Sequence, residues 1–173
     1  MKNVFSPHAI IGELEQNHAV FKAMLSGASA PLVRWKPAPD KWCLLEIVCH
    51  LHDEECEDFR ARLQHVLSHP EKEFTSIDPK GWVESRSYME QDYQTKLDAF
   101  LNERQRSIQW LKSLDKPSWD NAHQHRTLGP LSGKTFLSNW LAHDFLHIRQ
   151  ITRTKMEYLM AISEQDLTYA GNW

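Results

Sequence analysis

The segment HDFLH at residues 143–147 places His143 and His147 four residues apart. On a helix, residues at this spacing lie on one face, so the two imidazoles could bind one metal ion. The spacing alone is weak support, because the chain has 10 histidines in 173 residues. His65 and His69 form a second pair of the same kind. The surroundings of each pair must therefore decide which one could do chemistry.

The residues around the 143–147 pair are apolar. If the helix advances by about 100° per residue, the two histidines share one side with four large side chains: Phe136, Trp140, Ile151 and Tyr158. This pair therefore points toward the core, where an unpartnered imidazole would cost free energy. It needs either hydrogen-bond partners or a metal ion. His65 and His69 precede Pro70 at a helix end, and we interpret them as solvated or capping residues.

A third histidine, His50, favours the metal over simple hydrogen bonding. Every fourth residue after it is also polar: Glu54, Asp58 and Arg62. These residues form a polar row that crosses the expected core face of the helix. This row predicts a polar cavity; the alternative is an ion-pair ladder on a solvated flank. Three neutral histidines from two helices leave a coordination position open, as in catalytic metal sites. Glu54 or Asp58 would then orient a ligand or move a proton.

Other catalytic constellations are weaker. A ferritin-like di-iron site needs two Glu-x-x-His motifs, and only Glu15 to His18 fits, so we interpret His18 as a core histidine that could line the same cavity. No nucleophile elbow is present. Cys49 and Cys56 fall on the side of their helix away from its apolar stripe. The three cysteines form no CxxC pair, which indicates a reducing compartment and predicts a cytoplasmic protein.

Four amphipathic helices must position these side chains. We expect them at about residues 7–26, 43–68, 84–114 and 134–160. Only 6 glycines occur, and the composition, 41% hydrophobic and 25% charged, is typical of globular proteins. The fold class is therefore predicted to be all-α, a single four-helix bundle domain over residues 1–173. The connections are long enough to permit crossovers.

The charge pattern excludes some partners. A formal net charge of −3 gives no electrostatic footprint for nucleic acid or an acidic membrane. We find no signal peptide and no apolar run of about 20 residues that could span a bilayer. We therefore expect a small-molecule substrate, with no nucleic acid and no membrane as partner.

Several motifs resemble those of the DinB-like superfamily. The stretch KWCLLEI at 41–47, followed by His50 and an acidic cluster, resembles the opening motif of this family. Residues 103–114 resemble its third helix, and residues from Gly133 to Ile151 resemble its last motif. The resemblance implies an up-down-down-up bundle with a three-histidine metal site, carried here by His50, His143 and His147. Cys43 stands where the family usually has Ser or Thr.

The resemblance also implies a range of activities. Members include YfiT-like metal-dependent hydrolases and thiol transferases that use bacillithiol, mycothiol or glutathione, and dimers are common. We therefore expect a metal-dependent thiol S-transferase or hydrolase that acts on a small electrophilic molecule, with a low-molecular-weight thiol as a candidate partner. The alternatives are a non-catalytic metal-binding stress-response protein and a metal-free bundle with a small-ligand pocket.

The cofactor is expected to be one divalent metal ion. Imidazole suits several transition metals, so zinc or nickel is expected first, with iron or manganese as further candidates. Histidines must be neutral to bind metal, so affinity should fall as the pH drops through the imidazole range near ~6.5 or lower. Phe145 lies opposite the apolar stripe of its helix, which is compatible with a homodimer.

Overall fold

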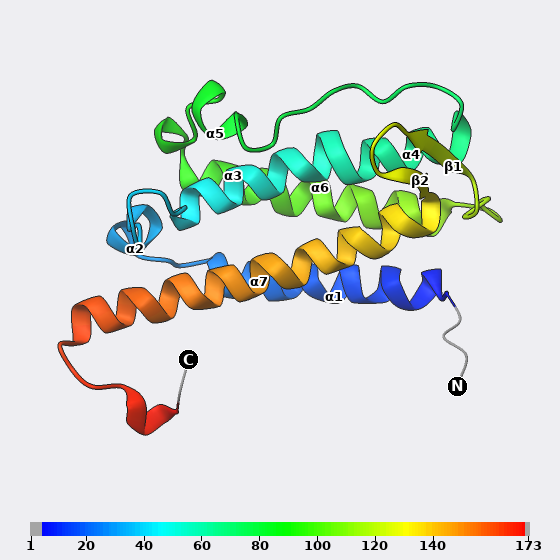
Figure 1. Cartoon of the computed structure of the whole chain (residues 1–173). Coiled ribbons are helices and arrows are strands. Elements are labelled where there is room, and N and C mark those ends of the chain that lie inside the picture. The colour runs from blue at the N-terminus through cyan, green and yellow to red at the C-terminus, as the bar shows by residue number, and fades with distance from the viewer. Residues whose placement is uncertain (1–4, 172–173) are drawn as a thin grey trace.

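The computed structural model describes residues 5–171, and four long helices dominate it (Figure 1). The second of them is continuous but consists of three segments. In chain order the long helices are α1 (Pro7–Leu25), the run α3 (Leu44–Glu54), η1 (Glu55–Phe59) and α4 (Arg60–Ser68), then α6 (Tyr93–Ser113) and α7 (Gly133–Ser163). The predicted all-α four-helix bundle is confirmed.

The order of the helices is up-down-down-up. Figure 1 shows α1 and α7 running in one direction, and the α3–α4 run and α6 in the other. Two consecutive helices that run in the same direction need a connection as long as the bundle, and residues 69–92 provide it. Within the bundle, α3 packs against α6, and α7 packs against α1.

Shorter elements fill the connections. These are α2 (Ala30–Arg34), α5 (Trp82–Ser85), the 3₁₀ turn η2 (Tyr88–Glu90), and the antiparallel hairpin β1 (Ala122–His125) and β2 (Gly129–Ser132). A further 3₁₀ turn, η3 (Thr168–Ala170), follows α7. The sequence predicted only turns before α7, because a hairpin of two four-residue strands gives too short an alternation to detect. Within residues 5–171, none of the helices combines the length and apolarity that a bilayer crossing needs.

The third long helix begins later than the predicted residue 84. Ser87 adopts a left-handed conformation with φ of 48°, which interrupts the helical path after α5. The helix then restarts at Tyr93, where the Asp92 side chain accepts a hydrogen bond from the Thr95 amide at 2.8 Å. An N-cap of this type satisfies an otherwise unpaired amide at the start of a helix.

Helix α3 is buried on nearly every side. All eight residues from Leu44 to Leu51 are buried, because α2, α5 and η2 cover the side that faces away from the bundle core. Cys49 lies on that side and is fully buried beside Tyr88 and Trp82. Helical periodicity puts Cys49 away from the apolar stripe, as predicted, but this second side of the helix is also covered. Burial raises the pKa of Cys49 to about 12, so its thiol stays protonated.

The segment η1 is a single π-helical turn between α3 and α4. Such turns insert one extra residue and are frequent at functional sites. The turn begins at Glu55, and the adjacent Glu54 and Glu55 are both buried, next to His50 and Arg104 respectively. It also places Phe59 against Trp140 and His143, with ring centroids 5.9 and 4.9 Å away. The turn therefore lies directly beside the inward histidines of α7.

Candidate metal centre

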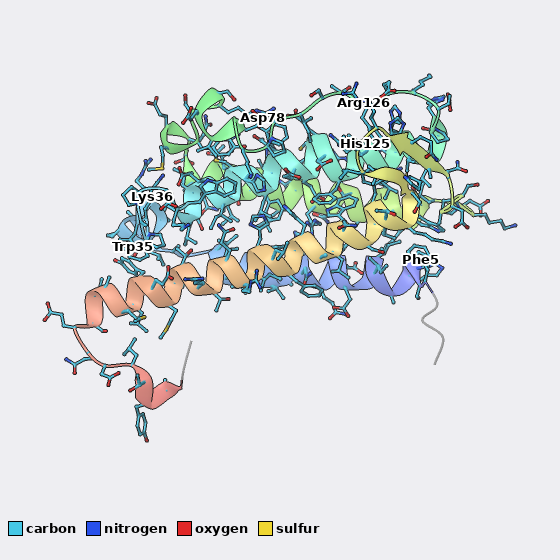
Figure 2. All side chains as sticks on the ribbon, viewed as in Figure 1. Phe5, Trp35, Lys36, Asp78, His125 and Arg126 are labelled. Atoms are coloured by element: carbon cyan, nitrogen blue, oxygen red, sulfur yellow. The ribbon has the colours of Figure 1, made fainter. Side chains whose placement is uncertain are left out.

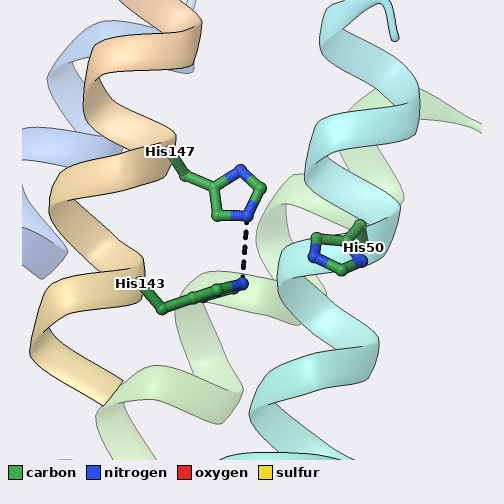
Figure 3. A group of neighbouring side chains, drawn as sticks. All are labelled: His50, His143 and His147. Carbon is green, nitrogen blue, oxygen red and sulfur yellow. Dashed lines mark hydrogen bonds between the residues drawn. The ribbon is translucent and has the colours of Figure 1, made fainter. Parts of the chain in front are cut away.

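Three histidines from two helices converge inside the bundle (Figure 3). One ring nitrogen from each of His50, His143 and His147 lies within 4.8 Å of the others. The Nε2 atoms of His143 and His147 are 3.0 Å apart. The ring centroid of His50 lies 5.5 Å from the ring centroid of His143 and 5.0 Å from that of His147. The structure thus brings together the three residues that the sequence analysis proposed as ligands.

Burial keeps these imidazoles neutral. It lowers the pKa of His50 to about 3, of His143 to about 2 and of His147 to about 4. For His50 and His143, repulsion from the neighbouring imidazoles lowers the pKa further. All three rings therefore present lone pairs at neutral pH, which is the state that binds metal.

The hydrogen bonds around the cluster are incomplete. Within residues 5–171, neither Nδ1 of His50 nor Nδ1 of His147 has a hydrogen-bond partner, although both atoms are buried. A buried polar atom without a partner costs about 1–3 kcal/mol. In addition, the facing Nε2 atoms of His143 and His147 can share only one proton. A protein that maintains this arrangement gains little stability from it alone.

The donor set fits a divalent ion. Imidazole nitrogens bind zinc at about 2.0–2.1 Å, so nitrogens that share an ion lie within about 4.2 Å of one another. The three nitrogens here lie within 4.8 Å, so small side-chain rotations would suffice. Three protein ligands leave at least one coordination position for another molecule. The residues could therefore hold a metal in an open site.

The acidic row begins beside His50. Glu54 is buried, and its carboxylate oxygen lies 4.0 Å from His50 Nε2. Burial, followed by the neighbouring Asp58 carboxylate, raises the pKa of Glu54 to about 8. Asp58 is partly exposed and forms an ion pair with Arg62 at 2.5 Å. The inner end of the row is therefore buried beside His50, and its outer end is the alternative ion-pair ladder.

Sequence reasoning missed a buried ion network behind the cluster. Arg104, on α6, donates to both carboxylate oxygens of Asp144 at 2.6 and 2.7 Å and to Glu55 at 2.9 Å. Asn17 donates to Asp144 at 3.1 Å, and the Trp140 indole donates to Glu55 at 3.1 Å. The network joins all four long helices next to His143.

A signal for this network was present in the sequence. Arg104 lies four residues after Phe100 and four before Ile108, within the apolar stripe of its helix. A cation in such a stripe needs a buried anion. Two acidic residues at core positions complete the inference. Glu55 lies four residues after Leu51 and four before Phe59, and Asp144 lies four residues after Trp140.

The remaining histidines lie outside the cluster. His18 is half-buried on α1 near the Leu101 backbone, and burial lowers its pKa. His65 contacts the Lys72 carbonyl at 2.9 Å, in agreement with a role at a helix end. His69 is largely exposed. Among the described residues, only His50, His143 and His147 form a group of metal-ligating side chains at this spacing.

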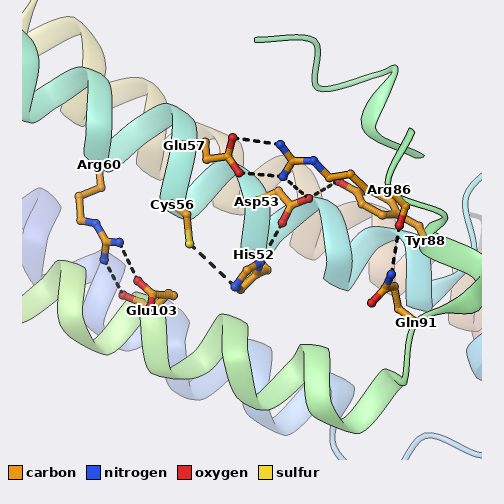
Figure 4. A network of polar contacts seen from close by, with 9 residues as sticks. All are labelled: His52, Asp53, Cys56, Glu57, Arg60, Arg86, Tyr88, Gln91 and Glu103. Atoms are coloured by element: carbon orange, nitrogen blue, oxygen red, sulfur yellow. Dashed lines mark hydrogen bonds and ion pairs between the residues drawn. The ribbon is translucent and has the colours of Figure 1, made fainter. Parts of the chain in front are cut away.

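A second polar network ties the long connection to α3 (Figure 4). Asp53 is contacted by Tyr88 Oη at 2.7 Å, by Arg86 at 2.8 Å and by His52 Nδ1 at 2.8 Å. Burial acts to raise the pKa of Asp53, but these three donors outweigh it and hold the pKa below its usual range. Burial raises the pKa of the nearby Cys56 thiol to about 12, so this thiol is a poor nucleophile.

Comparison with known proteins identifies the family. Residues 13–151 match the model of the DinB superfamily, and the chain belongs to this superfamily. Its structure is similar to that of YfiT from Bacillus subtilis, and the TM-score of the comparison is 0.79. YfiT is described as a probable metal-dependent hydrolase with an unusual four-helix bundle topology. The two chains are 18% identical, and the similarity covers 91% of each, which shows a shared fold. A search of the curated proteins finds no match.

Proposed function

We propose that the protein is a metal-dependent enzyme whose centre is His50, His143 and His147. The observation that supports this most strongly is a group of three neutral imidazoles with ring nitrogens within 4.8 Å of one another, of which His50 and His147 are buried and His143 is half-buried. Family membership and the similarity to YfiT agree with it. A divalent ion held there would supply positive charge that stabilises an attacking anion, derived from water or from a thiol.

Glu54 is the residue best placed to move a proton. Its carboxyl lies beside His50 and has a pKa of about 8, so at neutral pH it exchanges a proton readily. Positive charge at the histidine cluster would lower this pKa. The carboxyl could then accept the proton of the nucleophile and return it to a leaving group. Asp58 acts on Glu54 by repulsion, since it raises the pKa of that carboxyl.

Aromatic rings restrict water around the cluster. Trp42 lies against His50, with ring centroids 4.8 Å apart, and Phe59 lies against His143 at 4.9 Å. Low local polarity strengthens the interaction between a cation and an anionic nucleophile. The same exclusion of bulk water would allow a thiol to compete with water as nucleophile. We therefore propose both hydrolysis and thiol transfer to a small electrophile as candidate reactions. Separately, we propose that the protein is cytoplasmic and dimeric.

The experiment is turnover with defined metal loading. Protein reconstituted with zinc, nickel, iron or manganese is assayed with p-nitrophenyl esters, and with 1-chloro-2,4-dinitrobenzene in the presence of small thiols. We expect turnover that a chelator abolishes and that metal restores. His147→Gln should lose both metal binding and turnover, whereas the control His69→Gln, at a largely exposed position, should retain both.

The non-catalytic alternative gives a different result. A metal-sequestering protein would bind one equivalent of metal and gain stability, by about 2.7 kcal/mol at a hundredfold excess over Kd. It would show no turnover with any thiol or ester. Stabilisation without turnover across a broad panel would therefore contradict the enzyme proposal and support the binding protein.

A further inference from the structure

A cleft of about 700 Å³ lies beside the histidine cluster. It is formed by the connection between α2 and α3 on one side and by the C-terminal half of α7 on the other. Figure 2 shows Trp35 of this connection above the C-terminal end of α7, where its ring contacts Tyr158. The lining residues that matter here are Trp35, Lys41, Trp42, Gln150, Arg153 and Glu157.

The cleft and the cluster share a wall. Trp42 lines the cleft, and its ring also packs on His50 with centroids 4.8 Å apart. On α7, Gln150 and Thr154 line the cleft three and seven residues after His147, so they continue the face that carries this histidine. A molecule that fills the cleft would therefore extend away from the cluster along α7.

Two tryptophans make the cleft suitable for a flat apolar group. Trp35 is supported from behind by Tyr158, with ring centroids 5.5 Å apart in an edge-to-face arrangement. Trp42 packs against His50 in a tilted arrangement, with ring centroids 4.8 Å apart. Indole rings provide a large apolar surface and favour stacked or edge-to-face contact with other aromatic rings. Because both rings are already packed, little side-chain entropy would be lost on binding.

Cations outnumber carboxylates among the residues that line the cleft. Lys41 and Arg153 are its two cationic lining residues, and Glu157 is its one carboxylate. Arg153 pairs with Glu157 at 2.8 Å, and Lys41 pairs with the exposed Asp40 at 3.0 Å. Exposed pairs of this kind contribute only about 0–1 kcal/mol, so an incoming carboxylate could replace either partner. Arg149 lines an adjoining hollow that also includes Gln150 and Arg153.

We propose that this cleft is the substrate-binding subsite, and that the substrate is an organic anion with a flat apolar group next to its acidic group. The apolar group would lie between Trp35 and Trp42, and the acidic group would lie near Lys41 and Arg153. The reacting end would point past Trp42 toward the histidines. This inference rests on the proposed function, because it takes the histidine cluster as the reaction centre.

The test uses three probes of similar shape and different charge. The dissociation constants of 2-naphthoate, 2-naphthylmethanol and 2-naphthylmethylamine are measured by ligand-observed NMR with the full chain, before and after cobalt(II) loading. We expect naphthoate to bind at least tenfold more tightly than the amine. The double variant Lys41→Gln/Arg153→Gln should remove that preference. Arg106→Gln, which deletes an exposed cation on α6, is the matched control and should retain it.

Proximity to the centre is measured in the same samples. Paramagnetic cobalt at the three histidines should broaden the naphthoate signals, and the variant His147→Gln should abolish the broadening. Any one of three results would overturn the subsite. These are equal affinity for the three probes, an unchanged preference in the double variant, and naphthoate signals that are not broadened when cobalt is bound. Failure of cobalt to bind, with the charge preference and its loss in the double variant intact, would contradict the metal centre and still support the anion cleft.

Discussion

Arg104 donates two hydrogen bonds to Asp144, at 2.6 and 2.7 Å, and Asp144 directly follows His143 in the chain. The ion pair is buried, since Arg104 is 1% exposed and Asp144 is 0% exposed. It fixes the rotation of α7 about its axis relative to α6. Because His143 and His147 extend from α7 toward His50, the pair also fixes the direction in which these two rings point.

Removing Arg104 should destabilise the protein strongly. Arg104→Met preserves much of the side-chain volume but leaves Asp144 and Glu55 as buried carboxylates without a cation. Breaking a buried pair in this way costs about 3–5 kcal/mol. The free energy of unfolding, measured with urea, checks this. The exposed control Arg106→Gln should change it by less than about 0.5 kcal/mol. Equal stability of Arg104→Met and the parent would show that the network is not structural.

Glu54→Gln should separate metal binding from turnover. The amide cannot accept or return a proton, so we expect kcat to fall by about 10²–10⁴-fold. Metal affinity should change much less, because Glu54 lies 4.0 Å from His50 rather than among the three grouped nitrogens. The comparison is Glu57→Gln, which neutralises an exposed carboxylate on the same helical run and should leave kcat unchanged. A kcat within threefold of the parent in Glu54→Gln would remove this residue from the mechanism.

The metal-free protein should lose stability as the pH falls below about 6.5. The pKa values of His50, His143 and His147 are depressed in the folded state, whereas unfolded histidines titrate near ~6.5. Below this pH the unfolded chain therefore binds more protons than the folded chain, and the free energy of unfolding falls as the pH falls. From pH 6.5 to 5.5 the loss is about 1 kcal/mol per histidine. The raised pKa of Glu54 acts in the opposite direction by about 1 kcal/mol, which leaves a net loss of about 2 kcal/mol.

Urea unfolding in the presence of a chelator, at several pH values, measures this slope. His50→Gln should make it shallower, and Glu54→Gln should make it steeper, because each removes one of the opposing contributions. His69→Gln, at a largely exposed position, should leave it unchanged. A parent stability that is flat between pH 6.5 and 5.5, with no change in the two variants, would contradict burial of neutral histidines.

The structure revises the expected pH dependence of metal affinity. From the sequence, affinity is expected to fall as the pH drops through the imidazole range near ~6.5 or lower. Because the folded histidines have pKa values of about 2–4, proton competition at their nitrogens should be small above about pH 5. Glu54 remains as a group that would release a proton when metal binds, so affinity should change by at most about tenfold per pH unit.

Calorimetric titration of folded protein with zinc between pH 5.5 and 8 checks this prediction. The logarithm of affinity should vary with pH with a slope of about one or less. In Glu54→Gln the slope should approach zero. A slope near three around pH 6.5 would show that the ligands titrate as ordinary exposed histidines, contrary to their burial.

Much of the centre could be predicted from the sequence because helical periodicity is local. The stripe on α7 placed His143 and His147 inward, and the row that begins at His50 indicated a polar region on a second helix. Motifs along the chain then supplied the order of the helices, which composition and periodicity leave open. That order is what brings α3 and α7 face to face at the cluster.

The features that could not be predicted depend on distant contacts. Glu55 contacts Arg104, a residue 49 positions later in the chain, and the pattern of its own helix does not identify this partner. The burial of Cys49 depends on the connection that returns across α3. In both places, tertiary packing decides the environment of a side chain that the local pattern leaves undetermined.

The central claim is that His50, His143 and His147 hold one metal ion, and anomalous diffraction from crystals of the zinc-reconstituted protein tests it most directly. The account predicts one anomalous peak between α3 and α7, at about 2.0–2.1 Å from a ring nitrogen of each histidine. Zinc bound elsewhere in the crystal, with no peak among these three rings, would contradict it.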